Sequence, residues 1–228
     1  MKIGVVVFPG SNCDHDAYHV AKHVMGQEAR FVWHKEGDLT GIDAVILPGG
    51  FAYGDYLRTG AVARFSPIMG AVAEFARKGF PVLGICNGFQ VLCEAGLLPG
   101  ALRPNASLEF VCRDVDLRVE RTDTPFTSRC EPGARLTIPV KHGDGCWYAG
   151  AEDVGRLERR GQLLLRYEGG NPNGSVADVA GVLNERGNVM GLMPHPEHAV
   201  DPLLGPTGGI PILGSLVDAA RERLAVMV

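Results

Sequence analysis

The sequence predicts an α/β fold in which a doubly wound, mainly parallel sheet receives antiparallel additions in the second half of the chain. Two observations carry this prediction. Up to residue 95, continuous apolar runs are separated by stretches with helical periodicity, as in parallel strands that are buried on both faces. From residue 107 onward, apolar and polar residues alternate, which is typical of antiparallel strands with one face toward solvent.

The elements expected in the first half alternate between strand and helix. Each strand is a short apolar run, and each helix repeats its apolar residues at a spacing of three or four. The expected strands cover residues 3–8, 29–33, 44–47 and 81–85, and the expected helices cover residues 14–25, 67–77 and 89–95.

The second half is expected to add strands to the same core. Alternation marks residues 108–112 and 115–119, and strand-like runs cover residues 135–140 and 162–167. A hairpin pairs residues 179–183 with residues 189–193, and a last helix covers residues 212–225. No polar linker or repeat interrupts this pattern, so we expect a single domain over residues 1–228.

Composition and charge exclude several classes of protein. The chain of 228 residues is 46% hydrophobic and 21% charged, which excludes a disordered or fibrous protein. With 22 basic and 26 acidic residues, it lacks the basic surface that binds nucleic acid. No apolar stretch approaches the roughly 18 residues that span a bilayer, so no membrane partner is expected. Six cysteines without a Cys-x-x-Cys pair or an export signal indicate reduced thiols and a cytoplasmic location.

The most informative turn follows the strand expected at residues 81–85. Cys86 lies there between Gly84 and Gly88, where a strand meets a helix. A sharp turn at such a junction lifts a nucleophile clear of the sheet, and side chains on the flanking residues would clash with the backbone. The N–H groups of the helix N-terminus also favour a thiolate. From this segment alone, a buried structural cysteine is an equally good interpretation.

Cys13 is the rival nucleophile, because it also follows a strand and precedes a helix. Asp14 and Asp16 lie beside it in the sequence and are expected to raise the pKa of its thiol. We therefore expect Cys86 to be the nucleophile. The other four cysteines are interpreted as core or surface thiols: Cys93, Cys112, Cys130 and Cys146.

His195 and Glu197 could supply the base that a nucleophilic thiol needs and the acceptor that orients this base. Pro194 and Pro196 are expected to hold the segment extended, so that residues two apart face the same side. Taken alone, such a segment is more often a solvated loop. Together with Cys86, it predicts a Cys-His-Glu triad.

Backbone N–H groups near the nucleophile could stabilise an oxyanion. The turn at residues 48–51 follows a predicted strand and brings the amide of Gly50 to the edge of the sheet where Cys86 lies. The amides of Gly50 and Asn87 are therefore candidates for an oxyanion hole. A turn needed only for chain reversal fits the same residues equally well.

The sequence contains no clear motif for binding a metal or a nucleotide. His15, His19 and His23 share one face of a predicted helix, but no carboxylate or cysteine completes a metal site, so a solvated or packed stripe is favoured. Neither a Walker sequence nor a Gly-x-Gly-x-x-Gly motif is present. If the function needs ATP, we expect another chain to bind it.

The motif GICNGFQ at residues 84–90, together with His195-Pro196-Glu197, resembles the class I glutamine amidotransferases, whose triad is Cys, His and Glu in that order along the chain. Further blocks resemble, more narrowly, the glutaminase subunits of phosphoribosylformylglycinamidine synthase in purine biosynthesis. These blocks span nearly the whole chain: FPGSNCD at 8–14, PGGFAYGDYLR at 48–58, NPNGS at 171–175 and MPHPE at 193–197.

The resemblance implies a flavodoxin-like class I amidotransferase fold and the hydrolysis of glutamine to glutamate and ammonia. It implies that Cys86 attacks the side-chain amide, that His195 moves the proton and that Glu197 orients His195. The amides of Gly50 and Asn87 would hold the oxyanion.

The same resemblance implies a complex. The ammonia would pass to a synthetase subunit that uses ATP and magnesium to convert formylglycinamide ribonucleotide to formylglycinamidine ribonucleotide, and a small third subunit would bridge the two. This chain would need no cofactor or metal of its own. Gln90 would lie near the bound glutamine, and the candidates for the partner-facing surface are Asn12, Asn171, Asn173 and Ser175.

Two positions depart from the family pattern. Asp144 stands where a glutamate is usual, and His198 stands where an arginine is usual. Both are expected to lie around the triad, so they put fine specificity in question and leave the reaction unchanged.

Other functions stay open at this stage. The chain could serve an amidotransferase of another pathway, or be a related cysteine peptidase or deglycase. Those relatives generally take their histidine from the residue after the nucleophile, which here is Asn87. A catalytically silent regulatory module is disfavoured because all three triad positions are filled.

Overall fold

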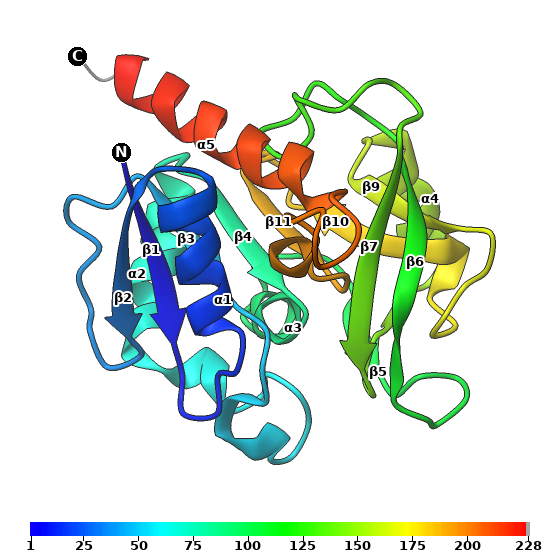
Figure 1. The fold of residues 1–228 in the computed structure, drawn as a ribbon. Helices are drawn as coiled ribbons and strands as arrows, with labels where there is room; N and C mark the ends of the chain where they lie inside the picture. Colours follow the sequence, from blue (N-terminus) through cyan, green and yellow to red (C-terminus); the bar gives the residue numbers. More distant parts are fainter. Residues whose placement is uncertain (227–228) are drawn as a thin grey trace.

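A nine-stranded sheet, parallel in one half, runs through the computed structural model, which describes residues 1–226 (Figure 1). The strands follow the spatial order β2-β1-β3-β4-β11-β10-β9-β6-β7. Neighbours from β2 to β11 pair in parallel. These strands are β1 (Lys2–Val7), β2 (Glu28–Trp33), β3 (Ala44–Leu47), β4 (Val82–Ile85) and β11 (Val189–Leu192).

The other half of the sheet is antiparallel throughout. It consists of β6 (Val111–Val119), β7 (Arg135–His142), β9 (Leu163–Glu168) and β10 (Val179–Leu183). A separate two-stranded sheet pairs β5 (Ala101–Arg103) with β8 (Cys146–Tyr148). The predicted fold class, a doubly wound parallel sheet with antiparallel additions, is therefore confirmed.

Helices cover both faces of the parallel strands, because successive right-handed crossovers run outward from β1 in opposite directions along the sheet. In Figure 1, α1 and α5 lie in front of the sheet, and α2 lies behind it. The helices are α1 (Asp14–His19), which continues into a π-helical turn (Val20–Val24), α2 (Pro67–Arg77), α3 (Asn87–Glu94), α4 (Ala151–Arg159) and α5 (Gly209–Val226).

One strand of the predicted hairpin belongs to the parallel core. The sequence analysis assigned β11 to the antiparallel additions, but it pairs in parallel with β4 and antiparallel only with β10. The four residues of β11 are all buried, as expected for a strand covered on both faces. This placement puts the segment after β11 at the same edge of the sheet as the turn after β4.

Two further expectations need correction or completion. Residues 108–110 do not belong to a strand, since β6 begins at Val111 and the side chains of Leu108 and Phe110 are exposed. The sequence analysis did not find β5, β8 or α4. The two strands are three residues long, too short to show a period, and α4 is mostly charged and contains Gly155.

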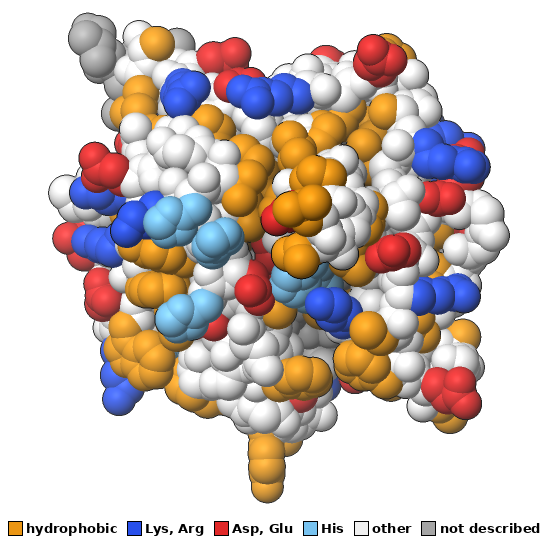
Figure 2. Space-filling model, in the orientation of Figure 1, with side chains coloured by type: hydrophobic (Ala, Val, Ile, Leu, Met, Phe, Trp, Pro, Cys, Tyr) orange, Lys and Arg blue, Asp and Glu red, His pale blue; other side chains and the backbone are white. Residues whose placement is uncertain are grey.

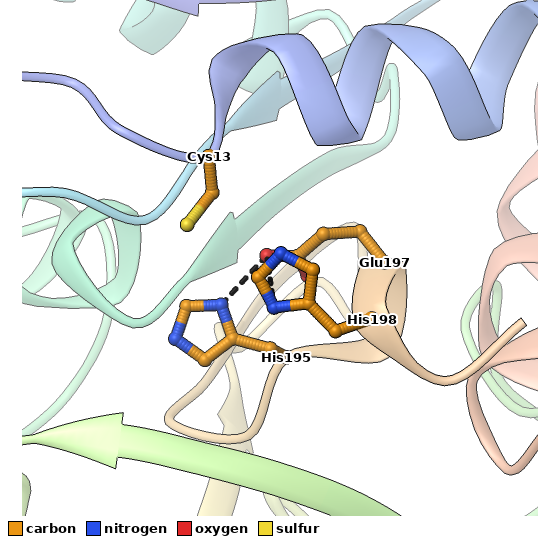
Figure 3. Close-up of side chains that lie close together, drawn as sticks. All are labelled: Cys13, His195, Glu197 and His198. Carbon is orange, nitrogen blue, oxygen red and sulfur yellow. Dashed lines mark hydrogen bonds and ion pairs between the residues drawn. The ribbon is translucent and has the colours of Figure 1, made fainter. Parts of the chain in front are cut away.

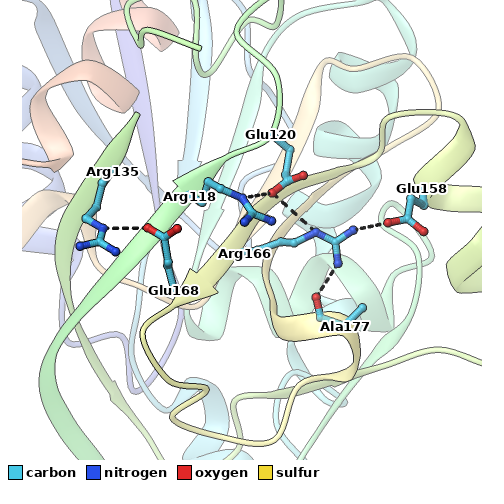
Figure 4. A network of polar contacts seen from close by, with 7 residues as sticks. All are labelled: Arg118, Glu120, Arg135, Glu158, Arg166, Glu168 and Ala177. Atoms are coloured by element: carbon cyan, nitrogen blue, oxygen red, sulfur yellow. Dashed lines mark hydrogen bonds and ion pairs between the residues drawn. The ribbon is translucent and has the colours of Figure 1, made fainter. Parts of the chain in front are cut away.

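A network of arginine and glutamate side chains crosses the outer strands of the antiparallel half (Figure 4). Arg166 on β9 contacts Glu158 on α4 at 2.6 Å, and Arg135 on β7 contacts Glu168 on β9 at 2.7 Å. Exposed ion pairs contribute about 0–1 kcal/mol each. The buried residues beneath them, such as Leu117 and Leu165, therefore contribute more to holding these strands.

No helix within residues 1–226 combines the length and the apolar character that a membrane span requires. On the face seen in Figure 2, acidic and basic side chains are interspersed, and histidine side chains gather over α1.

Candidate active site

Cys86 occupies a strained turn between β4 and α3. Its backbone has φ 50° and ψ −104°, a conformation that L-residues rarely adopt. A Cβ atom on Gly88 would overlap the carbonyl oxygen of Leu47, and one on Gly84 would lie 2.8 Å from the backbone of Gly88. The prediction that both flanking positions require glycine is confirmed. The turn holds the thiol at the end of β4, just before the first turn of α3.

His195 and Glu197 meet in the segment that follows β11. The N–H of His195 donates to the carbonyl oxygen of Pro139 on β7, at 2.8 Å, which anchors the segment to the sheet. His195 Nδ1 lies 2.6 Å from Glu197 Oε1, and both side chains are almost completely buried. The segment is not extended as expected, because Pro196–His198 forms a short 3-10 turn, for which proline at the first position is well suited.

The charges around His195 favour its protonated form. Burial lowers the pKa of His195, but its surroundings, above all the negative charge of Glu197, outweigh burial and raise this pKa well above its ordinary value. The Cys86 thiol is buried and donates to the carbonyl oxygen of Lys141 at 3.7 Å. Nε2 of His195 is buried and has no hydrogen-bond partner within residues 1–226. That nitrogen is therefore available for proton transfer.

The two predicted oxyanion donors come from different elements of the fold. Gly50 follows β3 and forms an isolated bridge with Ser11, and Asn87 is the first residue of α3. The side chain of Asn87 accepts from the N–H of Ala52 at 3.1 Å and donates to Gln90 at 2.9 Å. The first turn of α3 is thereby tied to the loop after Gly50.

A cavity of 220 Å³ connects the candidate residues. Cys86, His195, Gly50 and Gln90 all line it. A larger cavity of 390 Å³ beside α5 contains none of the predicted site residues, so we assign the substrate site to the smaller one. Several further residues that line the cavity were not predicted from the sequence: Asp55, Thr59, Phe110, Lys141 and His142. Of these, Asp55 lies in the motif block at 48–58, which could have indicated it.

Gln90 is held in place at both ends of its amide group. Its Nε2 donates to the carbonyl oxygen of Asp144 at 2.7 Å, and its Oε1 accepts from Asn87. Gln90 therefore fixes the segment after β7 against α3 and also presents its side chain to the cavity. Asp55 lies nearby, and burial together with the negative charge of Asp144 raises its pKa to about 6.

The family model for the CobB/CobQ-like glutamine amidotransferase domain matches residues 1–207. The chain belongs to this amidotransferase family.

Individual relatives agree with this assignment. The phosphoribosylformylglycinamidine synthase subunit PurQ of Salinibacter ruber is 59% identical over 225 residues, covering 95% of this chain and 96% of that protein. A chain in the structure of PurLQS from Thermotoga maritima has a TM-score of 0.87 at 46% identity, covering 95% of this chain and 97% of that one. A glutamine amidotransferase from Thermotoga maritima shares the fold. Its TM-score is 0.57 at 16% identity, and the match covers 100% of this chain and 85% of that one.

Cys13 lies closer to the amidotransferase triad than its sequence context suggests. Burial raises the pKa of its thiol, but the neighbouring side chains of His195 and His198 outweigh burial and lower the pKa. The expectation that Asp14 and Asp16 raise this pKa is therefore wrong. The two histidines, about 180 positions away in the sequence, decide the electrostatics of the thiol, and only the fold brings them there.

The two departures from the amidotransferase pattern both lie around the triad. Asp144 lines the cavity. The ring of His198 stacks on the ring of His195, with centroids 5.0 Å apart, and its Nε2 lies 3.1 Å from Asp16 Oδ2. His198 therefore belongs to the immediate surroundings of the catalytic candidates.

Two of the residues predicted to face a partner are in fact internal. Asn173 and Ser175 are 1% and 4% exposed, because their polar groups form hydrogen bonds with one another and with Gly145. Asn171 is half-buried and accepts from the N–H groups of Asn173 and Gly174, so it shapes the same loop. Only Asn12 is exposed, at the rim of the cavity, and its contact with a partner stays a prediction.

The three histidines of the first helix lie apart from the triad cluster. His15 packs on Phe31 with ring centroids 4.9 Å apart, and His19 packs on His23 at 5.1 Å. They form the packed and solvated stripe seen over α1 in Figure 2.

Proposed function

We propose that this chain is a glutaminase that hydrolyses the side-chain amide of glutamine, with residues 1–228 acting as one domain. The observation that carries the proposal is the convergence of the Cys86 turn and the buried His195–Glu197 pair on one cavity. The cavity volume of 220 Å³ lies below the about 300–1,000 Å³ of sites for larger ligands. It suits a substrate the size of an amino acid.

In the first half of the reaction, the thiolate of Cys86 attacks the amide carbon, a C–S bond forms and the amide oxygen becomes an oxyanion. The N–H groups of Gly50 and Asn87 donate hydrogen bonds to this oxyanion. Protonated His195 then gives its proton to the amide nitrogen, the C–N bond breaks and ammonia leaves.

In the second half, His195 takes a proton from a water molecule, which attacks the thioester carbon. The C–S bond breaks, the thiolate of Cys86 returns with His195 protonated again, and the new carboxyl group gives its remaining proton to solvent as glutamate leaves. Glu197 does not touch the substrate. It keeps Nδ1 of His195 protonated, so that Nε2 is the nitrogen that exchanges the proton. Gln90 contacts the substrate at the cavity wall.

We further propose that the ammonia passes to a synthetase partner that makes formylglycinamidine ribonucleotide from formylglycinamide ribonucleotide. The name of the 59% identical relative and the PurLQS assembly of the structural neighbour support this assignment. A small subunit would bridge the two chains. ATP and magnesium act on the synthetase, and the glutaminase step uses protein groups of this chain. The cytoplasmic location stays a prediction.

A glutamine-analogue electrophile tests the choice of nucleophile. We expect it to label Cys86 in the wild-type chain and in Cys13→Ala, and to leave Cys86→Ala unlabelled, as read by peptide mass spectrometry. With the partner subunits present, Cys86→Ala is expected to lose glutamine-dependent synthesis by more than about 10³-fold while ammonia-dependent synthesis persists. Labelling at Cys13 in the wild-type chain would refute the assignment.

A further inference from the structure

Four potential metal ligands form a cluster beside the cavity (Figure 3). Each of the four residues offers one ligand atom, and these atoms all lie within 4.8 Å of one another: Cys13, His195, Glu197 and His198. Cys13 comes from the turn before α1, and the other three come from the segment after β11. Thiolate sulfur, imidazole nitrogen and carboxylate oxygen are the ligands that Zn²⁺ prefers. We propose that this cluster is an inhibitory zinc site.

Unsatisfied groups in the cluster point to a bound cation. Glu197 Oε2 and His195 Nε2 are buried and have no hydrogen-bond partner within residues 1–226. Leaving a buried charged acceptor unpaired costs about 1–3 kcal/mol or more. A divalent cation beside Glu197 would satisfy the second carboxylate oxygen.

Cys13 is suited to act as a thiolate ligand. Zinc binds the deprotonated form of cysteine, whose sulfur is one of the preferred ligands of this ion. A Cβ atom on Gly49 would lie 3.3 Å from Cys13 Sγ and 3.4 Å from His195 Nδ1, so both potential ligand atoms lie beside the same backbone position. On binding, the Cys13 thiol releases its proton to solvent and the sulfur forms a bond to the metal.

The groups around His198 are those of a metal-binding histidine. Asp16 Oδ2 lies 3.1 Å from His198 Nε2, and a carboxylate on the far nitrogen orients a ligand histidine and increases its basicity. Lys141 Nζ lies 3.2 Å from His198 Nδ1, so an ammonium group already occupies the side that faces Glu197. Zn²⁺ would displace this ammonium. Zinc binds the neutral imidazole, so binding also releases the additional proton of His195. The negative charges of Glu197, Asp16 and the Cys13 thiolate then outnumber the positive charge of Lys141.

The cluster needs only a small contraction to coordinate zinc. Bond lengths of about 2.0–2.3 Å in a tetrahedral site place ligand atoms roughly 3.3–3.8 Å apart. Ligand atoms separated by up to 4.8 Å move inward by less than about 1 Å. If His195 Nδ1 and Glu197 Oε1 both bind the ion, these two atoms, which are 2.6 Å apart, move apart by a similar amount. Side-chain rotations can supply both movements.

Zinc bound here would stop glutamine hydrolysis, a consequence that rests on the proposed function. If His195 binds the ion through Nδ1, then Nε2 must keep its proton and cannot accept another. If it binds through Nε2, the nitrogen is blocked directly. In both cases, His195 loses its role as the proton carrier for Cys86.

Cobalt binding tests the site without any activity measurement. We expect the full chain to bind one equivalent of Co²⁺ with a thiolate-to-cobalt absorption band, and Zn²⁺ to abolish this band. Cys13→Ser should remove the band and weaken Zn²⁺ binding by more than about 30-fold, and His198→Gln should weaken it by about 10-fold. Cys112→Ser serves as the matched control, since Cys112 is exposed at the same cavity, and should keep the band.

The Cys86→Ser variant separates the two thiols near His195. The proposal requires that it retains the cobalt band. A band that persists in Cys13→Ser, or one that disappears in Cys86→Ser, would refute the site. Thermal unfolding of each variant shows whether it is folded, and His198→Gln provides an independent test should Cys13→Ser fail to fold.

The activity arm uses the assembled synthase. Zn²⁺ is expected to inhibit glutamine-dependent synthesis, to spare ammonia-dependent synthesis and to inhibit His198→Gln about 10-fold more weakly. Equal inhibition of both ammonia sources would refute the inhibitory role. If the chain has no glutaminase activity, the proposed function fails while the cobalt result still decides the metal site.

Discussion

His195 Nδ1 contacts Glu197 Oε1 at 2.6 Å in a part of the structure where both side chains are almost completely buried. A buried carboxylate requires a positive or hydrogen-bonding partner. This imidazole is the hydrogen-bonding partner of Glu197 within residues 1–226, and His198 Nδ1 lies farther away, 3.9 Å from the same oxygen. The contact therefore fixes the ring orientation and the protonated nitrogen of His195 at the same time. It also makes the two residues energetically dependent on each other.

Removing the charge of Glu197 tests this dependence. Glu197→Gln keeps the size of the side chain but removes the negative charge that raises the pKa of His195. We expect kcat for glutamine-dependent synthesis to fall by roughly 10²–10⁴-fold, the range of general acid–base catalysis, with little change in KM. Glu168→Gln, in an exposed pair with Arg135, is the control and should retain activity. A fall in kcat of less than threefold in Glu197→Gln would contradict the role.

Gly49 tests how tightly the imidazole is packed. A Cβ atom on Gly49 would lie 2.6 Å from His195 Cε1, so Gly49→Ala must push the ring aside. Displacing a catalytic group by about 1 Å reduces the rate by roughly 10²-fold, and kcat/KM for glutamine should fall accordingly. Gly70→Ala is the matched control: Gly70 lies in α2 with nothing within 4 Å of the added atom. It should keep full activity and gain about 0.4–1 kcal/mol of stability.

Asp55 is expected to make stability depend on pH. Because burial and Asp144 raise its pKa to about 6 in the folded state, against about 3.9 in the unfolded chain, the folded state binds more protons between these values. The free energy of unfolding therefore decreases as pH rises from about 4 to about 6. With partial exposure taken into account, the decrease is about 1 kcal/mol.

The variant Asp55→Asn should remove this contribution. Urea unfolding at pH 4, 5, 6 and 7 gives the free energy of unfolding of both proteins. As pH rises across this range, the free energy of unfolding of the variant should increase relative to that of the wild type. A difference that does not depend on pH would show that Asp55 titrates normally.

Asn173 is expected to support the fold and not a partner contact. Its amide donates to the carbonyl oxygen of Gly145 and to the hydroxyl of Tyr167, and its carbonyl oxygen accepts from Ser175. Asn173→Ala should lower the free energy of unfolding by about 2 kcal/mol, because buried partners lose their hydrogen bonds. The exposed Asn12 provides the comparison: Asn12→Ala should change the free energy of unfolding by less than about 0.5 kcal/mol. Equal effects of the two substitutions would contradict this view of Asn173.

The sequence by itself determined the features that depend on neighbouring residues. The apolar runs at β1, β3 and β4 predicted buried strands because periodicity is a local property of the chain. The glycines on both sides of Cys86 predicted the strained turn, since a Cβ atom on Gly84 would clash with the backbone of Gly88 within the same turn. Motif blocks spread along the chain indicated the amidotransferase family.

Tertiary structure alone decided the features that depend on residues distant in the sequence. It placed β11 in parallel beside β4, buried Asn173 in a polar network and brought His198 to Cys13. In each case, the partner that sets burial or charge lies far along the chain, and local periodicity carries no information about it. The pKa of Cys13 shows this best: the adjacent aspartates predict an increase, and two histidines that only folding brings near produce a decrease.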